Sequence, residues 1–273
     1  MRVDIIIPTY KPDDTFCLLL QKLQEQTFVI HELILVNTEE ALWNEAVRKY
    51  PIEQIRKELP FPSRIFHMTR ETFDHGGARN MGAGYSEADI LIFMTQDAVP
   101  ADERLVEHLV HALTSGAAGL GTSAKGAVAV AYARQLPRED CGIIERYTRQ
   151  FNYPKEGCVK SSEDIPRLGI KTFFCSDVCA AYRRDLFEQL GGFESPVIFN
   201  EDMFFAAHAV QEGYKVAYAA DAEVVHSHNY SAKQQFHRNF DLAVSQTAHP
   251  EIFEQVSSEA EGMRLVKNTM GYL

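Results

Sequence analysis

One aspartate and two histidines have the side chains and the positions to bind a divalent cation. Asp97 follows the apolar run Ile90–Met94, and His226 and His228 stand one residue apart at the end of another apolar stretch. Mg²⁺ prefers carboxylate oxygens, and imidazole nitrogens bind ions such as Mn²⁺. Side chains two positions apart on an extended segment share a face, so both histidines could reach one ion. The competing interpretation is ordinary turn chemistry, with Asp97 before Pro100 and two polar loop histidines.

The stretch from His75 to Asn80 (HGGARN) has groups that suit an anionic ligand. Its glycines, beginning with Gly76, permit close backbone approach, and a helix starting here offers free N–H groups to a diphosphate. Arg79 adds a forked cation. The alternative is a glycine-rich helix entrance with Arg79 in a surface ion pair.

Asn200, Glu201 and Asp202 place two carboxylates at the start of a predicted helix. A carboxylate in a cleft can remove the proton of an attacking hydroxyl group. Helix capping and the helix dipole favour the same residue types in any protein, so capping alone would explain Asn200 and either acid.

The composition excludes several classes of protein. The net charge of -11 disfavours nucleic acid as a partner, because polyanions are repelled. Five cysteines without C-x-x-C spacing favour neither a disulfide framework nor a structural zinc site. No apolar run approaches the roughly 20 residues that span a bilayer, and Pro8 ends the first run too early for a secretory signal. We therefore expect a cytoplasmic protein, with peripheral contact at the inner face of the membrane left open.

Apolar runs alternate with helical patterns in the first half of the chain. The predicted strands there are Val3–Ile7, Glu32–Val36, Ile65–Met68 and Asp89–Met94, and the predicted helices are Asp13–Gln26, Glu39–Tyr50 and Ala78–Ser86. Further along we expect helices at Asp102–Leu113, Arg183–Leu190, Glu201–Glu212, Ala232–Gln246 and Pro250–Asn268, and strands at Lys215–Ala219 and Glu223–His226. We also expect a strand pair within 116–134, a helix with a polar loop within 137–165, and an ordered segment at Thr172–Cys175. This alternation predicts an α/β fold with a mostly parallel sheet and helices on both faces.

In such sheets ligands bind beyond the carboxyl ends of the strands. Three polar segments fall at predicted strand ends: Pro8-Thr9-Tyr10, Asn37-Thr38-Glu39 and Thr95-Gln96-Asp97. We expect them to converge on one crevice. Thr9 and Tyr10 suit contacts to a nucleotide base, or they simply end a strand that Pro8 interrupts.

Six motifs in fixed order resemble the inverting family 2 glycosyltransferases of the GT-A fold, whose central sheet is Rossmann-like. They are VDIIIPTYKP, HGGARNMGA, FMTQDAVP, RRDLFEQLGGFES, NEDMFFAAHAVQEGYKVAY and AEVVHSHNYS, and they span about Val3 to Ser231. The stretch Gln96-Asp97, HGGARN and the His-Ser-His ending are similar to the rhamnosyltransferase-like branch.

The resemblance implies a nucleotide-sugar donor (dTDP-rhamnose, or alternatively a UDP-sugar), a Mn²⁺ or Mg²⁺ ion on its diphosphate, and direct displacement by a hydroxyl group of a growing or lipid-linked glycan. By resemblance Asp202 is the catalytic base with Glu201 beside it, and His226 is preferred to His228 as the partner of Asp97 at the ion. The donor would be contacted by Pro8, Thr9, Tyr10, Asn37, Glu39, His75, Gly76, Arg79, Thr95, Gln96, Asp97 and Asp177.

Two segments depart from the family pattern. Asn37-Thr38-Glu39-Glu40 stands where the family has Asp-Asp-Gly-Ser, and Thr95-Gln96-Asp97 stands where it has Asp-x-Asp. The second departure leaves one carboxylate where a metal site usually has two.

The economical organisation is one domain. We expect a GT-A domain at 1–231, with its nucleotide-binding half at about 1–100 and its acceptor-binding half at about 101–231. The residues 232–273 would form a helical extension on the same domain, where Lys233, His237 and Arg238 close over the donor, dock the acceptor or simply pack.

The rival functions are a nucleotidyltransferase, which should have a lysine-bearing glycine loop after the first strand, and a non-catalytic nucleotide-sugar- or carbohydrate-binding relative. A dehydrogenase is disfavoured because no G-x-G-x-x-G follows that strand.

Overall fold

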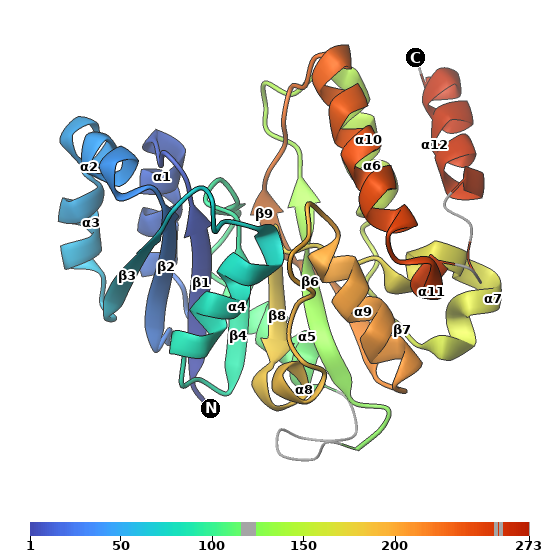
Figure 1. The fold of residues 1–273 in the computed structure, drawn as a ribbon, viewed down its shortest axis with the longest axis horizontal. Coiled ribbons are helices and arrows are strands. Elements are labelled where there is room, and N and C mark those ends of the chain that lie inside the picture. The colour runs from blue at the N-terminus through green and yellow to red at the C-terminus, as the bar shows by residue number, and fades with distance from the viewer. Residues whose placement is uncertain (116–123, 254–255, 257–258, 273) are drawn as a thin grey trace.

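The computed structural model describes residues 1–115, 124–253, 256 and 259–272, and the strands of this part form one twisted sheet (Figure 1). Its order is β3-β2-β1-β4-β8-β6-β9-β5, and β7 pairs with β9. The strands are β1 Val3–Thr9, β2 Glu32–Thr38, β3 Ser63–Met68, β4 Ile90–Met94, β5 Val99–Pro100, β6 Val128–Leu136, β7 Cys158–Lys160, β8 Cys179–Arg183 and β9 Lys215–Val225.

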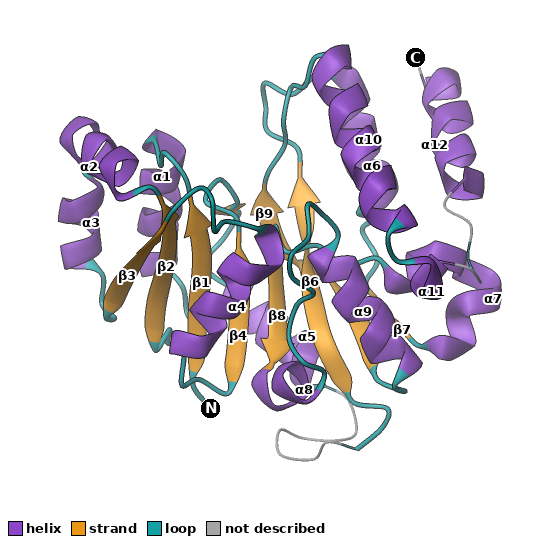
Figure 2. Cartoon of the chain, viewed as in Figure 1, coloured by secondary structure: helices purple, strands orange, loops and turns teal. Residues whose placement is uncertain are grey.

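Helices cover both faces of the sheet (Figure 2). They are α1 Asp14–Gln24, α2 Glu40–Lys49, α3 Ile52–Glu58, α4 His75–Tyr85, α5 Leu105–Thr114, α6 Ile143–Asn152, α7 Ile165–Leu168, α8 Arg184–Gln189, α9 Glu201–Gln211, α10 Ala232–Thr247, α11 Pro250–Phe253 and α12 Glu259–Tyr272, with 3₁₀ turns η1 Ser162–Asp164 and η2 Gly169–Phe173. None of these described helices has the length and apolar character to cross a bilayer.

The first four strands of the sheet order, β3, β2, β1 and β4, are all parallel. Beyond β4 the pairing is mixed, because β8 runs antiparallel to both β4 and β6 whereas β6 and β9 are parallel. The predicted α/β architecture with helices on both faces is confirmed.

Alternating residues of β1 pack against opposite helical layers, as the two-residue period of a strand requires. Ile5 and Ile7 join the core that α1 and α5 cover, whereas Ile6 joins the core beneath α4 and α9. Helix α4 lies very close to β1, because a Cβ added at Gly82 would overlap the side chain of Ile6. This close packing fixes the start of α4 near the carboxyl ends of the strands.

The ordered segment expected at Thr172–Cys175 is not a regular strand or helix. Those residues form the end of η2 and the loop after it, and the strand follows at Cys179–Arg183. The buried ammonium group of Lys160 donates to the carbonyl oxygens of Lys171, at 3.0 Å, and Phe174. The lysine thus satisfies carbonyls that a strand would direct to a neighbouring strand.

Other boundaries also differ from the prediction. The strands expected at Lys215–Ala219 and Glu223–His226 are one strand, β9, whose pairing with β6 shifts register between Ala133 and Arg134. Helix α4 begins at His75 because Asp74 caps it. The helix expected at Pro250–Asn268 is described as two helices, α11 and α12. The first member of the strand pair expected within 116–134 lies largely outside the described residues, and the second is β6.

Candidate active site

Three strand ends meet at one edge of the sheet, as expected. The Thr9 hydroxyl donates to the side-chain oxygen of Asn37 at 3.2 Å, which joins the ends of β1 and β2. The Gln96 side chain accepts the backbone N–H of Tyr10 at 2.8 Å and donates to its carbonyl oxygen at 3.0 Å, which joins β1 to the loop after β4. Gln96 therefore holds the loop that carries Asp97.

Pro8, Glu39 and Thr95 are the other residues of these segments that were expected to contact the donor. Pro8 is an interior residue of β1 paired with Val36. The backbone of Glu39 lies in the left-handed region, and its carboxylate accepts the backbone N–H of Arg70 at 2.6 Å. Thr95 lines the cavity described next, and its hydroxyl is buried.

A cavity of about 450 Å³ lies between the loop after β4, the sheet, α6, α9 and α10. Of the three polar strand-end segments, Thr95 and Asp97 line it, and the residues after β1 and β2 do not. Asp97, His226 and His228 line it together with the cluster of acids around Asp202. The two sites predicted from separate parts of the sequence therefore share one cavity.

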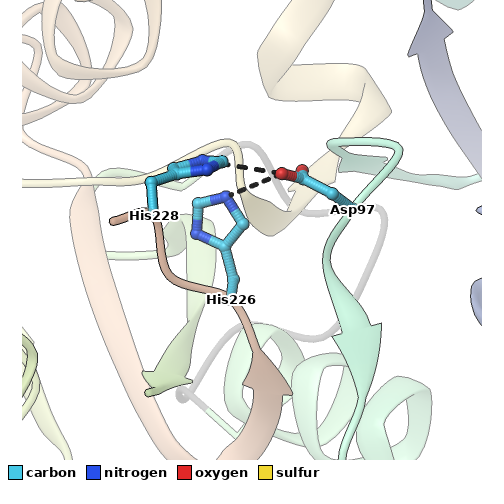
Figure 3. A group of neighbouring side chains, drawn as sticks. All are labelled: Asp97, His226 and His228. Atoms are coloured by element: carbon cyan, nitrogen blue, oxygen red, sulfur yellow. Dashed lines mark ion pairs between the residues drawn. The ribbon is translucent and has the colours of Figure 1, made fainter. Parts of the chain in front are cut away.

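Asp97, His226 and His228 form a compact cluster (Figure 3). The Nε2 atoms of both histidines lie 3.5 Å from the same oxygen, Oδ2 of Asp97, and potential ligand atoms of the three residues lie within 4.8 Å of one another. One carboxylate and two imidazoles on a common centre fit a divalent ion such as Mn²⁺, whose remaining positions phosphate oxygens and water would fill.

The electrostatics of this cluster suit a cation. Burial tends to raise the pKa of Asp97, but the hydrogen bond and charge of His226 and the charge of His228 outweigh it and hold this pKa well below its usual range. Burial, followed by the proximity of His226, lowers the pKa of His228 to about 4. At neutral pH the cluster therefore offers a carboxylate and an uncharged His228 imidazole.

A second cluster of charged groups lies at the start of α9. The carboxylate of Asp202 accepts the backbone N–H of Asp177 at 3.0 Å and that of Met203 at 2.7 Å. Asp177 also accepts a 2.6 Å hydrogen bond from the Tyr182 hydroxyl. Tyr182 is fully buried, and its ring packs edge-on against that of Phe93. The aromatic core beneath the sheet thus orients the loop that contacts Asp202.

Burial is the main reason that the pKa of Asp202 is raised to about 7, and the neighbouring charge of Glu201 raises it further. The pKa of Asp177 is also raised, first by burial and then by Asp202 and Glu201, although Arg79 opposes the shift. Because three carboxyl groups share one cationic partner, they cannot all be ionised without a large cost in free energy.

Arg79 is the cation of this acidic cluster, a different contact from the diphosphate expected from the sequence. Its guanidinium lies 3.1 Å from a carboxylate oxygen of Asp177 and 3.1 Å from one of Glu201, and it also donates to the carbonyl oxygen of His75 at 3.0 Å. Only 4% of Arg79 is exposed. Its charge is therefore already paired.

The glycine-rich entrance of α4 also has structural partners. A Cβ at Gly76 would overlap the carbonyl oxygen of Glu194, so the loop at Glu194 requires a glycine there. Asp74 accepts the N–H of Gly77 at 2.9 Å and so uses one free donor of the helix start. His75 lines the cavity, its ring stacks on that of Phe199 at 5.3 Å, and burial lowers its pKa.

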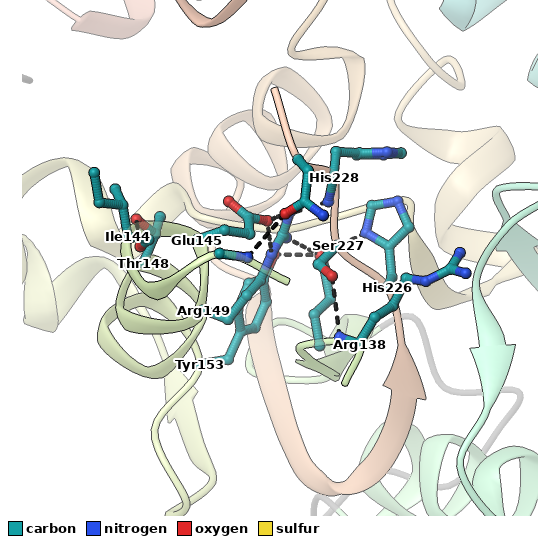
Figure 4. Close-up of polar contacts among 12 residues, drawn as sticks. Arg138, Ile144, Glu145, Thr148, Arg149, Tyr153, His226, Ser227 and His228 are labelled. Atoms are coloured by element: carbon teal, nitrogen blue, oxygen red, sulfur yellow. Dashed lines mark hydrogen bonds and ion pairs between the residues drawn. The ribbon is translucent and has the colours of Figure 1, made fainter. Parts of the chain in front are cut away.

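Several cavity residues were not predicted. Gln135 from β6 and Glu145, Arg149 and Tyr153 from the region of α6 form its far wall, where Glu145 and Arg149 make an ion pair of 2.7 Å (Figure 4). They lie in segments with no recognisable motif, so the sequence carried no signal for them.

Helix α10 places Arg238 at the cavity. Its guanidinium lies 5.1 Å from the ring centroid of Phe199 and 5.9 Å from that of Tyr230. Among the described cavity residues, Arg79 and Arg149 pair with carboxylates, whereas Arg238 has no carboxylate within ion-pair distance. Arg238 is therefore the guanidinium of the cavity best able to meet an anionic ligand.

The sequence of this chain is similar to those of known glycosyltransferases. A family model described as "Glycosyl transferase family 2" matches residues 4–191. The O-antigen chain rhamnosyltransferase RfbN of Salmonella typhimurium is 37% identical over 275 residues, which cover 100% of this chain and 82% of that protein. The O-antigen chain rhamnosyltransferase WbaN of Salmonella anatum is 40% identical over 215 residues, which cover 78% of this chain but 65% of that protein.

Solved structures show the same fold at low sequence identity. The mannosyltransferase PcManGT from Pyrobaculum calidifontis, in complex with GDP-Man and Mn²⁺, superposes with a TM-score of 0.62 at 17% identity, covering 91% of this chain and 62% of that chain. TarS of S. aureus in complex with UDP-GlcNAc gives 0.58 at 15% identity, covering 87% of this chain and 64% of that chain. The family match ends at residue 191, before Asp202, His226 and His228, so it gives no information about these three residues.

Proposed function

We propose that this chain, which belongs to glycosyl transferase family 2, transfers rhamnose from a dTDP-linked donor to a growing polysaccharide or lipid-linked glycan, with inversion. Support for the sugar comes from the two relatives, whose names state rhamnosyl transfer to the O-antigen chain. Nucleotide-sugar complexes among the structural relatives support the class of donor.

The observation that carries the mechanism is that the cluster at Asp97 and the acid Asp202 line one cavity. A donor whose diphosphate lies at Asp97 would present its sugar inside this cavity. The acceptor hydroxyl attacks the anomeric carbon as the bond to the diphosphate oxygen breaks, and its proton passes to the carboxylate of Asp202. A single displacement of this kind inverts the anomeric centre.

Asp202 suits the role of base better than Glu201. Glu201 is held in the ion pair with Arg79, whereas the two hydrogen bonds that Asp202 receives come from backbone N–H groups. A pKa of about 7 makes Asp202 a stronger base than an ordinary aspartate and still leaves it substantially ionised at neutral pH.

The leaving diphosphate develops negative charge that the site must offset. Asp97, His226 and His228 would hold a Mn²⁺ or Mg²⁺ ion, which supplies this positive charge when it is bound. Arg238 lies on α10 near the same cavity, and we propose it as the arginine contact of the diphosphate in place of Arg79. Pro8, Thr9, Tyr10, Asn37 and Glu39 remain the proposed surroundings of the nucleotide.

We further propose a cytoplasmic enzyme that touches the membrane face from its C-terminal helices. An apolar residue recurs every four positions along α10, at Phe236, Phe240 and Val244. Their exposed fractions are 68%, 59% and 40%, respectively. A lipid-linked acceptor would bring such an apolar stripe close to a bilayer. Co-sedimentation with vesicles, lost in Phe236→Ser with Phe240→Ser, would test the contact.

The donor is tested by thermal unfolding with a panel of dTDP-, UDP- and GDP-sugars, each with and without Mn²⁺. A ligand at 100 times its Kd stabilises the native state by about 2.7 kcal/mol. We expect dTDP-rhamnose with Mn²⁺ to give the largest rise in Tm. A larger shift with a UDP-sugar would identify the alternative donor, and binding without any transfer to glycan would identify a non-catalytic relative.

A further inference from the structure

Gln135 connects the proposed metal cluster to the wall of the cavity. It lies in β6, only 2% of it is exposed, and both ends of its amide are used. The oxygen Oε1 lies 3.0 Å from Nδ1 of His226 and accepts from Arg149. The nitrogen Nε2 donates to the hydroxyls of Tyr153 and, at 2.9 Å, Ser176.

The orientation of this amide follows from the chemistry of Arg149. A guanidinium group has only donors, so the atom of Gln135 that faces it must be the oxygen. Arg149 is held by Glu145, its ion-pair partner on the previous turn of α6 (Figure 4). The reversed amide would place two donors face to face in a buried site.

The orientation of the amide in turn decides the tautomer of His226. Because Oε1 of Gln135 can only accept, Nδ1 of His226 must carry the hydrogen. In the neutral ring, Nε2 is then left with its lone pair, and Nε2 is the atom that lies 3.5 Å from Asp97. A metal ligand needs this arrangement, in which the other ring nitrogen donates to a fixed acceptor.

We propose that Gln135 is a positioning residue that fixes His226 as the Nδ1–H tautomer and aims the lone pair of Nε2 at the cation site. A series of hydrogen bonds sets this tautomer, from Glu145 through Arg149 and Gln135 to His226. The inference rests on the proposed glycosyltransferase site and adds a residue to it that does not itself touch the ion or the substrates.

His228 provides an internal comparison. Among the described residues no hydrogen-bond partner is seen for its Nδ1, and 34% of its side chain is exposed, against 7% for His226. Its ring packs on that of Tyr230 at 4.9 Å. Gln135 therefore fixes the hydrogen on Nδ1 of His226, whereas no described residue accepts a hydrogen from Nδ1 of His228.

The direct test is ¹⁵N NMR of histidine-labelled, metal-free protein at about pH 8, where imidazoles are mostly neutral. Resonances are assigned with His226→Gln and His228→Gln. We expect Nδ1 of His226 to carry a hydrogen in the wild type, whereas Nδ1 of His228 should carry none, because its Nε2 faces the Asp97 carboxylate. An Nδ1 of His226 without a hydrogen in the wild type overturns the proposal, and this result requires neither a bound metal nor a substitution at Gln135.

Two variants extend the test to metal binding. Gln135→Glu keeps an acceptor oxygen toward His226 and Arg149, whereas Gln135→Met keeps the approximate volume and removes it. We expect Gln135→Met to weaken Mn²⁺ binding about 10- to 100-fold, the usual effect of losing the partner of a ligating histidine, and Gln135→Glu to retain it.

Equal Mn²⁺ affinity in the wild type and Gln135→Met would refute the positioning role while leaving the metal site intact. A wild type that binds no Mn²⁺ would refute the proposed metal site, and the tautomer of His226 would still decide the inference. The two failures are therefore distinguishable.

Discussion

Oδ2 of Asp202 accepts the backbone N–H of Asp177 at 3.0 Å, so the proposed base is tied to the loop that precedes β8. The side chain of Asp177 in turn contacts Arg79, which also pairs with Glu201. The position and the pKa of Asp202 therefore depend on Asp177, Arg79 and Glu201.

The rate of transfer should depend on pH through Asp202. Burial, and then the charge of Glu201, raises its pKa from 3.8 to about 7. The base must be ionised to accept a proton, so activity is full above this pKa and falls about tenfold per pH unit below it. The measurement is kcat/KM for transfer from about pH 5 to 9. An acidic limb near pH 4, that of an ordinary aspartate, would contradict the account.

Replacing Arg79 should damage both the fold and the base. Arg79→Met leaves the carboxyl groups of Asp177 and Glu201 buried without a cation, and breaking such a pair costs about 3–5 kcal/mol. The pKa of Asp202 should rise further, which moves the acidic limb to higher pH. Thermal unfolding and the pH profile measure the two effects. Arg104→Met, which breaks an exposed ion pair with Glu107, is the control and should leave both unchanged.

A fold as stable as the wild type in Arg79→Met would show that the buried pairs contribute little. An acidic limb that stays in place would show that Arg79 does not act on Asp202. A role confined to the diphosphate would instead raise the KM for the donor without moving the limb.

Two glycines of α4 should respond oppositely to alanine. At Gly76 a methyl group would overlap the carbonyl oxygen of Glu194, and forcing it in should cost about 1–3 kcal/mol or more. At Gly84, in the last turn of the same helix, no atom lies within 4 Å of the added Cβ. Gly84→Ala should stabilise the helix by up to about 1 kcal/mol. The free energies of unfolding of both variants are measured in urea. An unchanged free energy of unfolding in Gly76→Ala would show that the loop at Glu194 moves to accommodate the methyl group.

The alternation of strand and helix patterns was enough to predict which strand ends would meet. Thr9, Asn37 and Gln96 each end a hydrophobic run, and parallel strands bring such ends to one edge of a sheet. The pairing of Asp97 with His226 was predicted by the resemblance, and the two-residue spacing predicted that His226 and His228 share a face, but which histidine would lie at Asp97 was left open.

The wall of the cavity was not predictable in the same way. Gln135 is an ordinary residue in a strand, and only the tertiary fold brings it between His226 and Arg149. The contacts of Arg79 differ from the expected diphosphate contact for a related reason. The spacing of residues in the sequence does not reveal whether an arginine faces a ligand or a neighbouring carboxylate.

The cation site is tested by chelation and substitution. EDTA should abolish transfer and Mn²⁺ should restore it, and Asp97→Asn and His228→Ala should each weaken Mn²⁺ binding measured by calorimetry. His111→Ala on α5, an exposed histidine outside this cavity, is the matched control and should bind as the wild type does. Full activity in EDTA, or unchanged affinity in Asp97→Asn, would eliminate the metal site.

The most direct test of the account is the rate of sugar transfer by Asp202→Asn, measured together with its affinity for the donor. Asparagine keeps the size of the side chain but cannot accept the proton. We predict that kcat falls by about 100- to 10,000-fold, the contribution typical of a general base, while the Kd for the nucleotide sugar stays within a few-fold of the wild type. Transfer at the wild-type rate in a folded Asp202→Asn protein would contradict the assignment of Asp202 as the base.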